Sequence, residues 1–190
     1  PESVKAINDD AVGILTRACD ALNIPLLHIS TDYVFDGNKE TPYLETDATS
    51  PLSVYGATKL AGEKKLLALS KKHIILRTSW VFSATGNNFV KTMLRLFRER
   101  TEVRIVNDQY GGPTSADAIA KALLKIATRV LEPDFNDWGI YHFSGEPAVS
   151  WYEFACAIRE ACAPDSLKLH QLLPIPSTAY PTKAARPTYA

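Results

Sequence analysis

The chain has 190 residues, of which 46% are hydrophobic and 22% charged, with 21 basic and 21 acidic side chains. This is the composition of a globular domain with a sizeable core, and a formal net charge of zero gives no electrostatic basis for binding nucleic acid or an anionic membrane. No apolar run approaches the ~20 residues of a membrane span, and the three cysteines lack metal-site spacing. We therefore expect a cytoplasmic protein with free thiols and no signal peptide.

The first elements predict a helix followed by a strand. The apolar periodicity favours a helix over residues 1–22, and the apolar run 26–29 predicts a strand buried on both faces. Ser30, Thr31 and Asp32 follow this strand directly. Small polar residues at the carboxyl end of a buried parallel strand lie where open α/β sheets bind ligands. The alternative is that they only end the strand or begin a turn.

The next predicted helix, 53–70, carries Tyr55 and Lys59. A spacing of four residues puts both side chains on one helix face. A lysine ammonium beside a phenol favours the phenolate and lowers the tyrosine pKa, so that the tyrosine could exchange a proton with a sugar oxygen near neutral pH. The spacing alone is also consistent with a solvated helix face.

Further helices and strands alternate along the rest of the chain. Trp80 follows the strand predicted from residue 74 and is either a core residue or an aromatic that stacks on a sugar or base. Asp117 falls in the first turn of a helix beginning after Ser115, where it suits the helix dipole. The remaining predictions are helices at 88–100, 115–130 and 151–163, strands at 103–106 and 139–143, and a proline-rich tail of loops and extended segments from residue 164.

This order predicts an α/β fold with a doubly wound parallel sheet, a Rossmann-like domain. Such sheets begin with a strand, a glycine-rich turn and a helix that holds a pyrophosphate, and no such turn occurs in these residues. We therefore expect residues 1–190 to be a partial single domain that lacks the glycine-rich βαβ portion, as an internal piece of a longer protein.

Several motifs in the same order resemble the dTDP-4-dehydrorhamnose reductases, a family of extended short-chain dehydrogenases/reductases. Together they cover nearly the whole chain and are far more specific than the tyrosine–lysine spacing alone. The motifs are HISTDYVFDG (28–37), ETDATSPLSVYGATKLAGE (45–63), ILRTSWVF (75–82), GNNFVKTML (86–94), VNDQYGGPT (106–114), WYEF (151–154) and AARP (184–187).

The resemblance implies reduction of the C4 ketone of dTDP-4-dehydro-L-rhamnose to dTDP-L-rhamnose with NADPH or NADH. It implies that Tyr55 is the proton donor, that Lys59 holds the nicotinamide ribose and lowers the Tyr55 pKa, and that Thr31 hydrogen-bonds the reacting oxygen. Ser30 falls beside the cofactor, and a small substrate-binding portion comes from about 84–115 and 144–190. The implied substrate contacts are Thr31, Asp32, Trp80, Asn88, Gln109 and Arg186.

In this family Mg²⁺ can bridge subunits through acidic residues, and Asp117 aligns with one of them, although the helix dipole explains Asp117 better. The implied partner is a dTDP-sugar, and a homodimer stays open because the sequence does not fix the oligomeric state. The missing glycine-rich turn leads us to expect that the 190 residues alone bind NADPH poorly and turn over little or not at all.

Three other interpretations stay open. A nucleotide-sugar epimerase or dehydratase is one, but a dehydratase typically has Asp-Glu after the threonine, whereas here Thr31-Asp32 is followed by Tyr33. A non-catalytic subunit is the second, since the regulatory beta subunit of methionine adenosyltransferase resembles the same family. The third is a stable α/β domain without activity.

Overall fold

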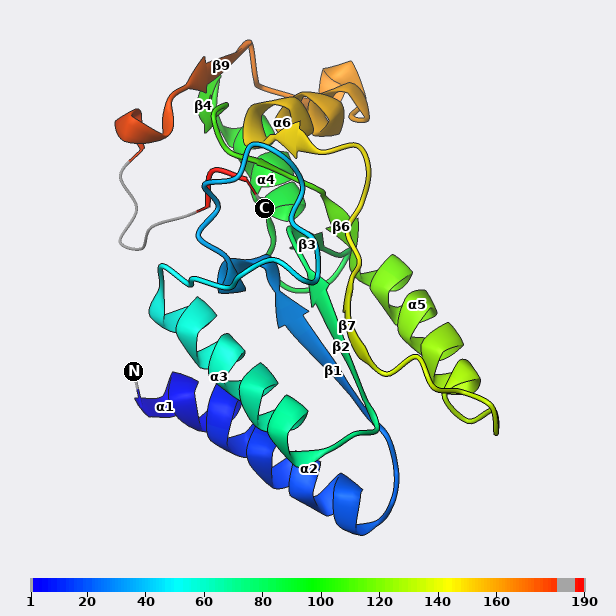
Figure 1. The fold of residues 1–190 in the computed structure, drawn as a ribbon. Helices are drawn as coiled ribbons and strands as arrows, with labels where there is room; N and C mark the ends of the chain where they lie inside the picture. Colours follow the sequence, from blue (N-terminus) through cyan, green and yellow to red (C-terminus); the bar gives the residue numbers. More distant parts are fainter. Residues whose placement is uncertain (1, 181–186, 190) are drawn as a thin grey trace.

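A three-stranded parallel sheet lies at the centre of the computed structural model, which describes residues 2–180 and 187–189. Its strands are β1 (Leu26–Thr31), β2 (His73–Thr78) and β7 (Gly139–His142), in the order β1-β2-β7. The register places Thr31 beside Thr78 and Arg77 beside His142. The carboxyl ends of all three strands therefore meet at one edge (Figure 1). The predicted α/β fold with a parallel sheet is confirmed.

Two long helical segments cover one side of this sheet (Figure 1). The first consists of α1 (Glu2–Lys5), the π-helical turn η1 (Ala6–Asp10) and α2 (Ala11–Ala21), and the second is α3 (Val54–Leu69). The predicted first helix is thus present but contains a π turn. At this π turn, Lys65 Nζ of α3 lies 2.6 Å from Asp9 Oδ1 and 2.8 Å from Asp10 Oδ1, and these ion pairs connect the two helical segments.

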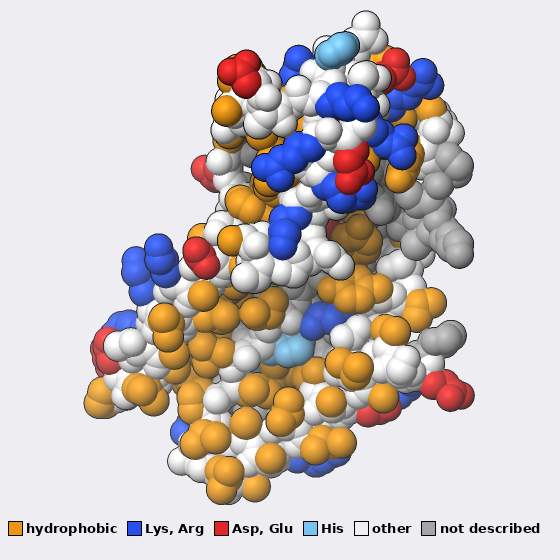
Figure 2. Space-filling model, turned by 180° about the vertical axis from the view of Figure 1, so that it is seen from behind, with side chains coloured by type: hydrophobic (Ala, Val, Ile, Leu, Met, Phe, Trp, Pro, Cys, Tyr) orange, Lys and Arg blue, Asp and Glu red, His pale blue; other side chains and the backbone are white. Residues whose placement is uncertain are grey.

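β1 is less buried than its apolar sequence predicts. Ile29 is 43% exposed, although Ser30 and Thr31 beside it are buried. The reason is positional, because within the residues described here β1 pairs only with β2 and so forms the edge of the sheet. Other apolar side chains are exposed on the neighbouring helices, and Figure 2 shows hydrophobic atoms spread over the lower part of that view.

A second hydrophobic cluster lies beyond the carboxyl edge of the sheet. It is built by α4 (Phe89–Glu99), β4 (Glu102–Val106), α6 (Trp151–Glu160) and β9 (Gln171–Ile175), with β4 and β9 paired in parallel. The proline-rich composition of the tail predicts only loops and extended segments there, and the structure adds the strand β9. Pro174 is tolerated because this sheet has only two strands in the described chain. β9 therefore needs backbone N–H donors only on the side that faces β4, and the N–H that proline lacks is not needed on the other side.

Short strands join the sheet to the second cluster. β3 (Val81–Phe82) pairs in parallel with β6 (Thr114–Ser115), and β5 (Tyr110–Gly111) pairs antiparallel with β8 (Val149–Ser150). α5 (Ala116–Arg129) follows β6 and lies on the other side of the central sheet from α2 and α3 in Figure 1. The 3-10 turns are η2 (Asp32–Val34), η3 (Pro164–Ser166) and η4 (Ser177–Ala179).

Candidate active site

The carboxyl end of β1 presents a hydroxyl and a carboxylate. The strand ends at Thr31, and η2 begins at Asp32. The Thr31 hydroxyl accepts a hydrogen bond from the Tyr33 amide at 3.2 Å and donates one to Asp32 Oδ1 at 3.0 Å. Because the Thr31 hydroxyl both caps η2 and binds Asp32, its position is fixed by the backbone at the strand end.

The first turn of α3 brings Tyr55 to this strand end. Ser53 caps the helix by accepting a hydrogen bond from the Gly56 amide at 3.0 Å. The Tyr55 ring packs edge-on against the Tyr33 ring, with centroids 5.8 Å apart, and remains 46% exposed. Burial raises the pKa of Tyr55, a hydrogen bond with the Thr31 side chain lowers it, and the Asp32 charge raises it. The phenol is therefore linked to Thr31 and still accessible to a ligand.

Gly56 allows this close approach. A Cβ at this position would overlap the backbone carbonyl oxygen of Tyr33 and touch Pro51. Since a carbonyl cannot swing away as a flexible side chain can, only glycine lets the start of α3 lie against η2.

We expect Gly56→Ala to displace the start of α3 from β1 and to weaken the link between Tyr55 and Thr31. The overpacking should cost about 1–3 kcal/mol of unfolding free energy, which denaturant titration measures. Gly86→Ala is the matched control, because a Cβ there meets open space, although its positive φ of 68° brings some strain. Equal stability of Gly56→Ala and the wild-type protein would contradict this explanation.

Lys59 lies one turn after Tyr55, and its ammonium is held by β1. Its Nζ donates to the Ile29 carbonyl oxygen at 2.7 Å and lies 3.3 Å from His28 Nε2. Burial lowers the pKa of Lys59, and burial with the Lys59 charge lowers the pKa of His28 to about 4. The spacing of Tyr55 and Lys59 predicts that Lys59 lowers the pKa of Tyr55, but in the structure burial dominates and the Tyr55 pKa is raised.

A buried ion pair that sequence analysis missed holds α3 against β2. Arg77 Nη2 and Nε donate to the two carboxylate oxygens of Glu63 at 2.7 and 3.1 Å, and both side chains are at most 4% exposed. The Arg77 guanidinium also lies 5.1 Å from the Phe35 ring centroid. The sequence did carry a signal for this ion pair, namely a glutamate between Leu60 and Leu66 on the core side of a helix and an arginine in an apolar strand.

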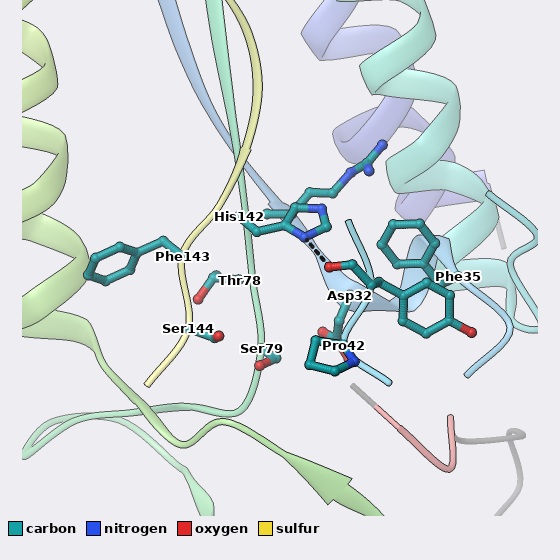
Figure 3. A pocket seen from close by; sticks show the side chains of 10 residues that line it. Asp32, Phe35, Pro42, Thr78, Ser79, His142, Phe143 and Ser144 are labelled. Atoms are coloured by element: carbon teal, nitrogen blue, oxygen red, sulfur yellow. Dashed lines mark hydrogen bonds between the residues drawn. The ribbon is translucent and has the colours of Figure 1, made fainter. Parts of the chain in front are cut away.

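A cavity of about 110 Å³ lies at the carboxyl ends of β1, β2 and β7 (Figure 3). Around it, Figure 3 shows Asp32 from the end of β1, Thr78 and Ser79 from the end of β2, and His142 from β7. His142 is fixed by the Tyr43 carbonyl oxygen, 3.1 Å from its Nδ1. The lining consists of Asp32, Phe35, Pro42, Tyr43, Arg77, Thr78, Ser79, His142, Phe143 and Ser144.

Asp32 has an unusual acidity for an aspartate. Burial raises its pKa to about 6, against the smaller lowering effect of the Thr31 hydrogen bond. Because the pKa is higher in the folded than in the unfolded state, the protonated carboxyl stabilises the fold fully below about pH 4, and this stabilisation is lost as the pH rises through about 6.

We expect Asp32→Asn, which cannot ionise, to gain stability relative to the wild-type protein as the pH rises from 4 to 8. A shift from 3.8 to about 6 corresponds to about 3 kcal/mol of unfolding free energy. Thermal unfolding at the two pH values measures it. Asp36→Asn is the matched control, because the Tyr43 hydroxyl lowers the pKa of half-buried Asp36. Its titration therefore lies below pH 4, and its stability relative to the wild-type protein should hardly change between pH 4 and 8. If the difference in unfolding free energy between Asp32→Asn and the wild-type protein were the same at pH 4 and pH 8, the raised pKa of Asp32 would be contradicted.

Trp80 lies past the end of β2, stacked on an aromatic partner. Its backbone has a positive φ of 46°, and its ring stacks on the Trp151 ring with centroids 3.4 Å apart and an interplanar angle of 6°. A Cβ on Gly111 would overlap the Trp80 ring. Beside this stack lies a cavity of about 480 Å³, lined by Tyr33, Phe89, Thr92, Met93, Leu96, Val103, Arg104, Ile105, Val106, Trp151 and Tyr180.

The remaining expected site residues have varied surroundings. The Oδ1 of Asn88 caps α4 by accepting from the Lys91 amide at 3.1 Å, and its Nδ2 donates to the Ser83 carbonyl oxygen at 2.7 Å. Gln109 is half-buried in the loop before β5, and the Ser30 hydroxyl is buried without a hydrogen-bond partner among the described residues. Arg186 lies outside the described residues.

Asp117 is exposed in the first turn of α5, as expected for a residue that suits the helix dipole. Within residues 2–180 and 187–189, no three His, Cys, Asp or Glu side chains are grouped so that they could hold a metal ion. Within the same residues, no helix is both long enough and apolar enough to cross a bilayer.

Comparison with known proteins places this geometry in a family. The family model for the RmlD substrate binding domain matches residues 1–190. The chain belongs to the RmlD substrate binding domain family. Its structure superimposes with a TM-score of 0.87 on a Bacillus anthracis dTDP-4-dehydrorhamnose reductase solved in complex with NADP, which is 37% identical, over 96% of this chain and 62% of that one.

Curated relatives of this RmlD-family chain carry the same name. It is 51% identical over 187 residues to the dTDP-4-dehydrorhamnose reductase of Aggregatibacter actinomycetemcomitans and 46% identical over 190 residues to that of Escherichia coli K12. The matches cover 97% and 98% of this chain. The chain spans 64% and 63% of the length of these two relatives.

Proposed function

We propose that the protein carrying this chain reduces the C4 ketone of dTDP-4-dehydro-L-rhamnose to dTDP-L-rhamnose with NADPH or NADH. The observation that supports it most is the half-exposed Tyr55 phenol, linked to the Thr31 hydroxyl at the end of β1 and one helical turn from Lys59. Relatives that carry the name of this activity add to that support.

Tyr55 donates its proton to the ketone oxygen as the oxygen gains charge. Thr31 holds the same oxygen when Asp32 is protonated, because the single hydrogen of the Thr31 hydroxyl is then not donated to Asp32. General acids of this kind contribute roughly 10²- to 10⁴-fold in rate. A bound nicotinamide cofactor supplies the hydride. The accessible face shared by Tyr55 and Lys59 fits such a ligand, with Lys59 on the ribose and Ser30 nearby.

The sugar nucleotide is proposed to lie across Trp80 and the cavity of about 480 Å³. Aromatic and apolar walls suit a base, and the cavity takes its lining mostly from α4, β4 and α6. The substrate-binding portion is therefore proposed to comprise about 84–115 and 144–190. Asn88 then shapes this portion through its cap, while Gln109 and Arg186 are proposed as contacts from the loops.

The experiment is to mix the whole protein that carries this chain with dTDP-4-dehydro-L-rhamnose and NADPH and to follow the loss of nicotinamide absorbance. We expect oxidation that requires the sugar nucleotide. dTDP-glucose, which has a C4 hydroxyl in place of the ketone, is the matched substrate control. A folded protein that binds both ligands and oxidises no NADPH would contradict the reductase and favour a non-catalytic subunit.

A further inference from the structure

We propose that Asp32 carries the proton that reloads Tyr55, passing it through the Thr31 hydroxyl and taking it from water in the cavity at the ends of β1, β2 and β7. This inference rests on the proposed reductase function, since each reduction consumes one proton. It assigns to Asp32 a task other than the substrate contact expected from the sequence.

The Thr31 hydroxyl lies between the Tyr55 phenol and the Asp32 carboxyl. It donates to Asp32 Oδ1 at 3.0 Å, and the Thr31 side chain is near enough to the Tyr55 phenol to lower its pKa. A hydroxyl has one donor and two acceptor sites, and its hydrogen rotates to suit. Thr31 can therefore donate to an ionised Asp32, or accept from a protonated Asp32 and donate to a Tyr55 phenolate.

The other oxygen of Asp32 is buried, and Asp32 is one of the residues that line the cavity. Asp32 Oδ2, Arg77 Nη1, Thr78 Oγ1 and His142 Nε2 are buried without a hydrogen-bond partner among the described residues, and all four residues line this cavity. Buried polar atoms are almost always paired, with water where protein groups are absent. A water needs roughly 10–15 Å³ of such space, so about 110 Å³ holds several.

The cavity is distinct from the space beside the phenol. Tyr55, Lys59 and Trp80 are not among its lining residues, whereas Asp32 is. Asp32 thus binds the Thr31 hydroxyl through Oδ1 and is also a lining residue of the cavity. This arrangement places the carboxyl between the proton donor and a water store.

The proton balance closes in two steps. After Tyr55 has given its proton to the ketone oxygen, the phenolate takes the Thr31 hydroxyl proton while Thr31 takes the proton of the Asp32 carboxyl. The negative charge moves from Tyr55 to Asp32, and no electron is transferred. Asp32 then takes one proton from solvent through the cavity water, which restores the resting state.

The surroundings of Asp32 suit this exchange. Its pKa of about 6, raised by burial, is close to the value at which a group can both take and give a proton near neutrality. The titratable and charged groups on the elements packed around it are Tyr33 on η2, Tyr55, Lys59 and Glu63 on α3, Arg77 on β2, His142 on β7, and Tyr43 and Glu45 in the loop.

The test is rapid mixing of the active protein, its Asp32→Asn variant and its Asp36→Asn variant with both substrates. Asparagine keeps an acceptor for Thr31 but carries no exchangeable acid proton. We expect Asp32→Asn to complete a first turnover at close to the wild-type rate and to slow later turnovers about tenfold or more. Asp36→Asn, at a nearby half-buried aspartate, should show no such difference between turnovers.

Two further measurements distinguish the proposed proton transfer from Asp32 through Thr31 to Tyr55, called the relay below, from a role of Asp32 in substrate binding or structure. In the wild-type protein, later turnovers should slow above pH 6 by up to about tenfold per pH unit, while the first turnover changes less. In a Thr31→Val background, adding Asp32→Asn should cause no further loss, because both act in one chain.

A raised KM for the sugar nucleotide with unchanged kcat in Asp32→Asn would show a substrate contact and overturn the relay. Equal slowing of first and later turnovers would overturn it as well. Both results leave the reductase intact, whereas a wild-type protein without NADPH oxidation would overturn the proposed function and the relay with it.

Discussion

Replacing Tyr55 with phenylalanine is expected to lower kcat for NADPH oxidation by roughly 10²- to 10⁴-fold, the contribution of a positioned general acid. Phenylalanine keeps the ring that packs against Tyr33 and removes only the hydroxyl linked to Thr31. The loss should therefore fall on kcat, with little change in KM or in unfolding free energy. Steady-state kinetics with varied dTDP-4-dehydro-L-rhamnose measure both constants.

Tyr141→Phe is the matched control for Tyr55→Phe. The Tyr141 hydroxyl donates to the Asp137 carbonyl oxygen at 2.7 Å, outside the site, so that kcat should be unchanged. If Tyr55→Phe kept the wild-type kcat, another group would have to supply the proton. The assignment of Tyr55 would then be wrong even if the protein is a reductase.

Glu63→Ala is expected to cause the largest loss of stability, about 3–5 kcal/mol of unfolding free energy. The substitution leaves the Arg77 guanidinium buried without its carboxylate, and both side chains are nearly inaccessible to solvent. A buried charge without a partner costs far more than the pair contributes. Urea titration of the wild-type protein and the variant measures the difference.

The surface offers a matched comparison for the buried pair. Glu99→Ala removes the exposed partner of Arg95, a pair 2.9 Å apart on α4 with more than half of each side chain exposed. Its loss should cost at most about 0.5 kcal/mol. Similar losses for Glu63→Ala and Glu99→Ala would contradict the view that burial makes the Arg77–Glu63 pair critical.

The grouping of Thr31, Asp32, Tyr55 and Lys59 in space was predictable because these residues belong to elements with strong sequence patterns. Ser30, Thr31 and Asp32 follow an apolar run, and the capped helix starting after Ser53 carries Tyr55 and Lys59. The end of β1 and the start of α3 each fix locally the direction in which their side chains point. Their meeting follows from the parallel sheet, which the alternation of helices and strands predicts.

Other features were not predictable because they depend on contacts between distant segments. Pairing of β4 with β9 is not signalled by either strand alone, and Pro174 argues against it. The cavity beside Asp32 draws Arg77 and His142 from two other strands. The sign of the Tyr55 pKa shift is set by burial, which residue spacing does not report.

The large cavity beside the Trp80–Trp151 stack takes most of its walls from a later part of the chain than the residues at the end of β1. Thr31, Asp32, Tyr55 and Lys59 belong to the first third of the sequence. The large cavity takes only Tyr33 of its lining residues from that third, and the others come from α4, β4, Trp151 and Tyr180. Substitutions in that later region can reshape the cavity without touching β1 or α3. Under the proposed function, selection could therefore alter which nucleotide sugar is held while Thr31, Tyr55 and Lys59 stay unchanged.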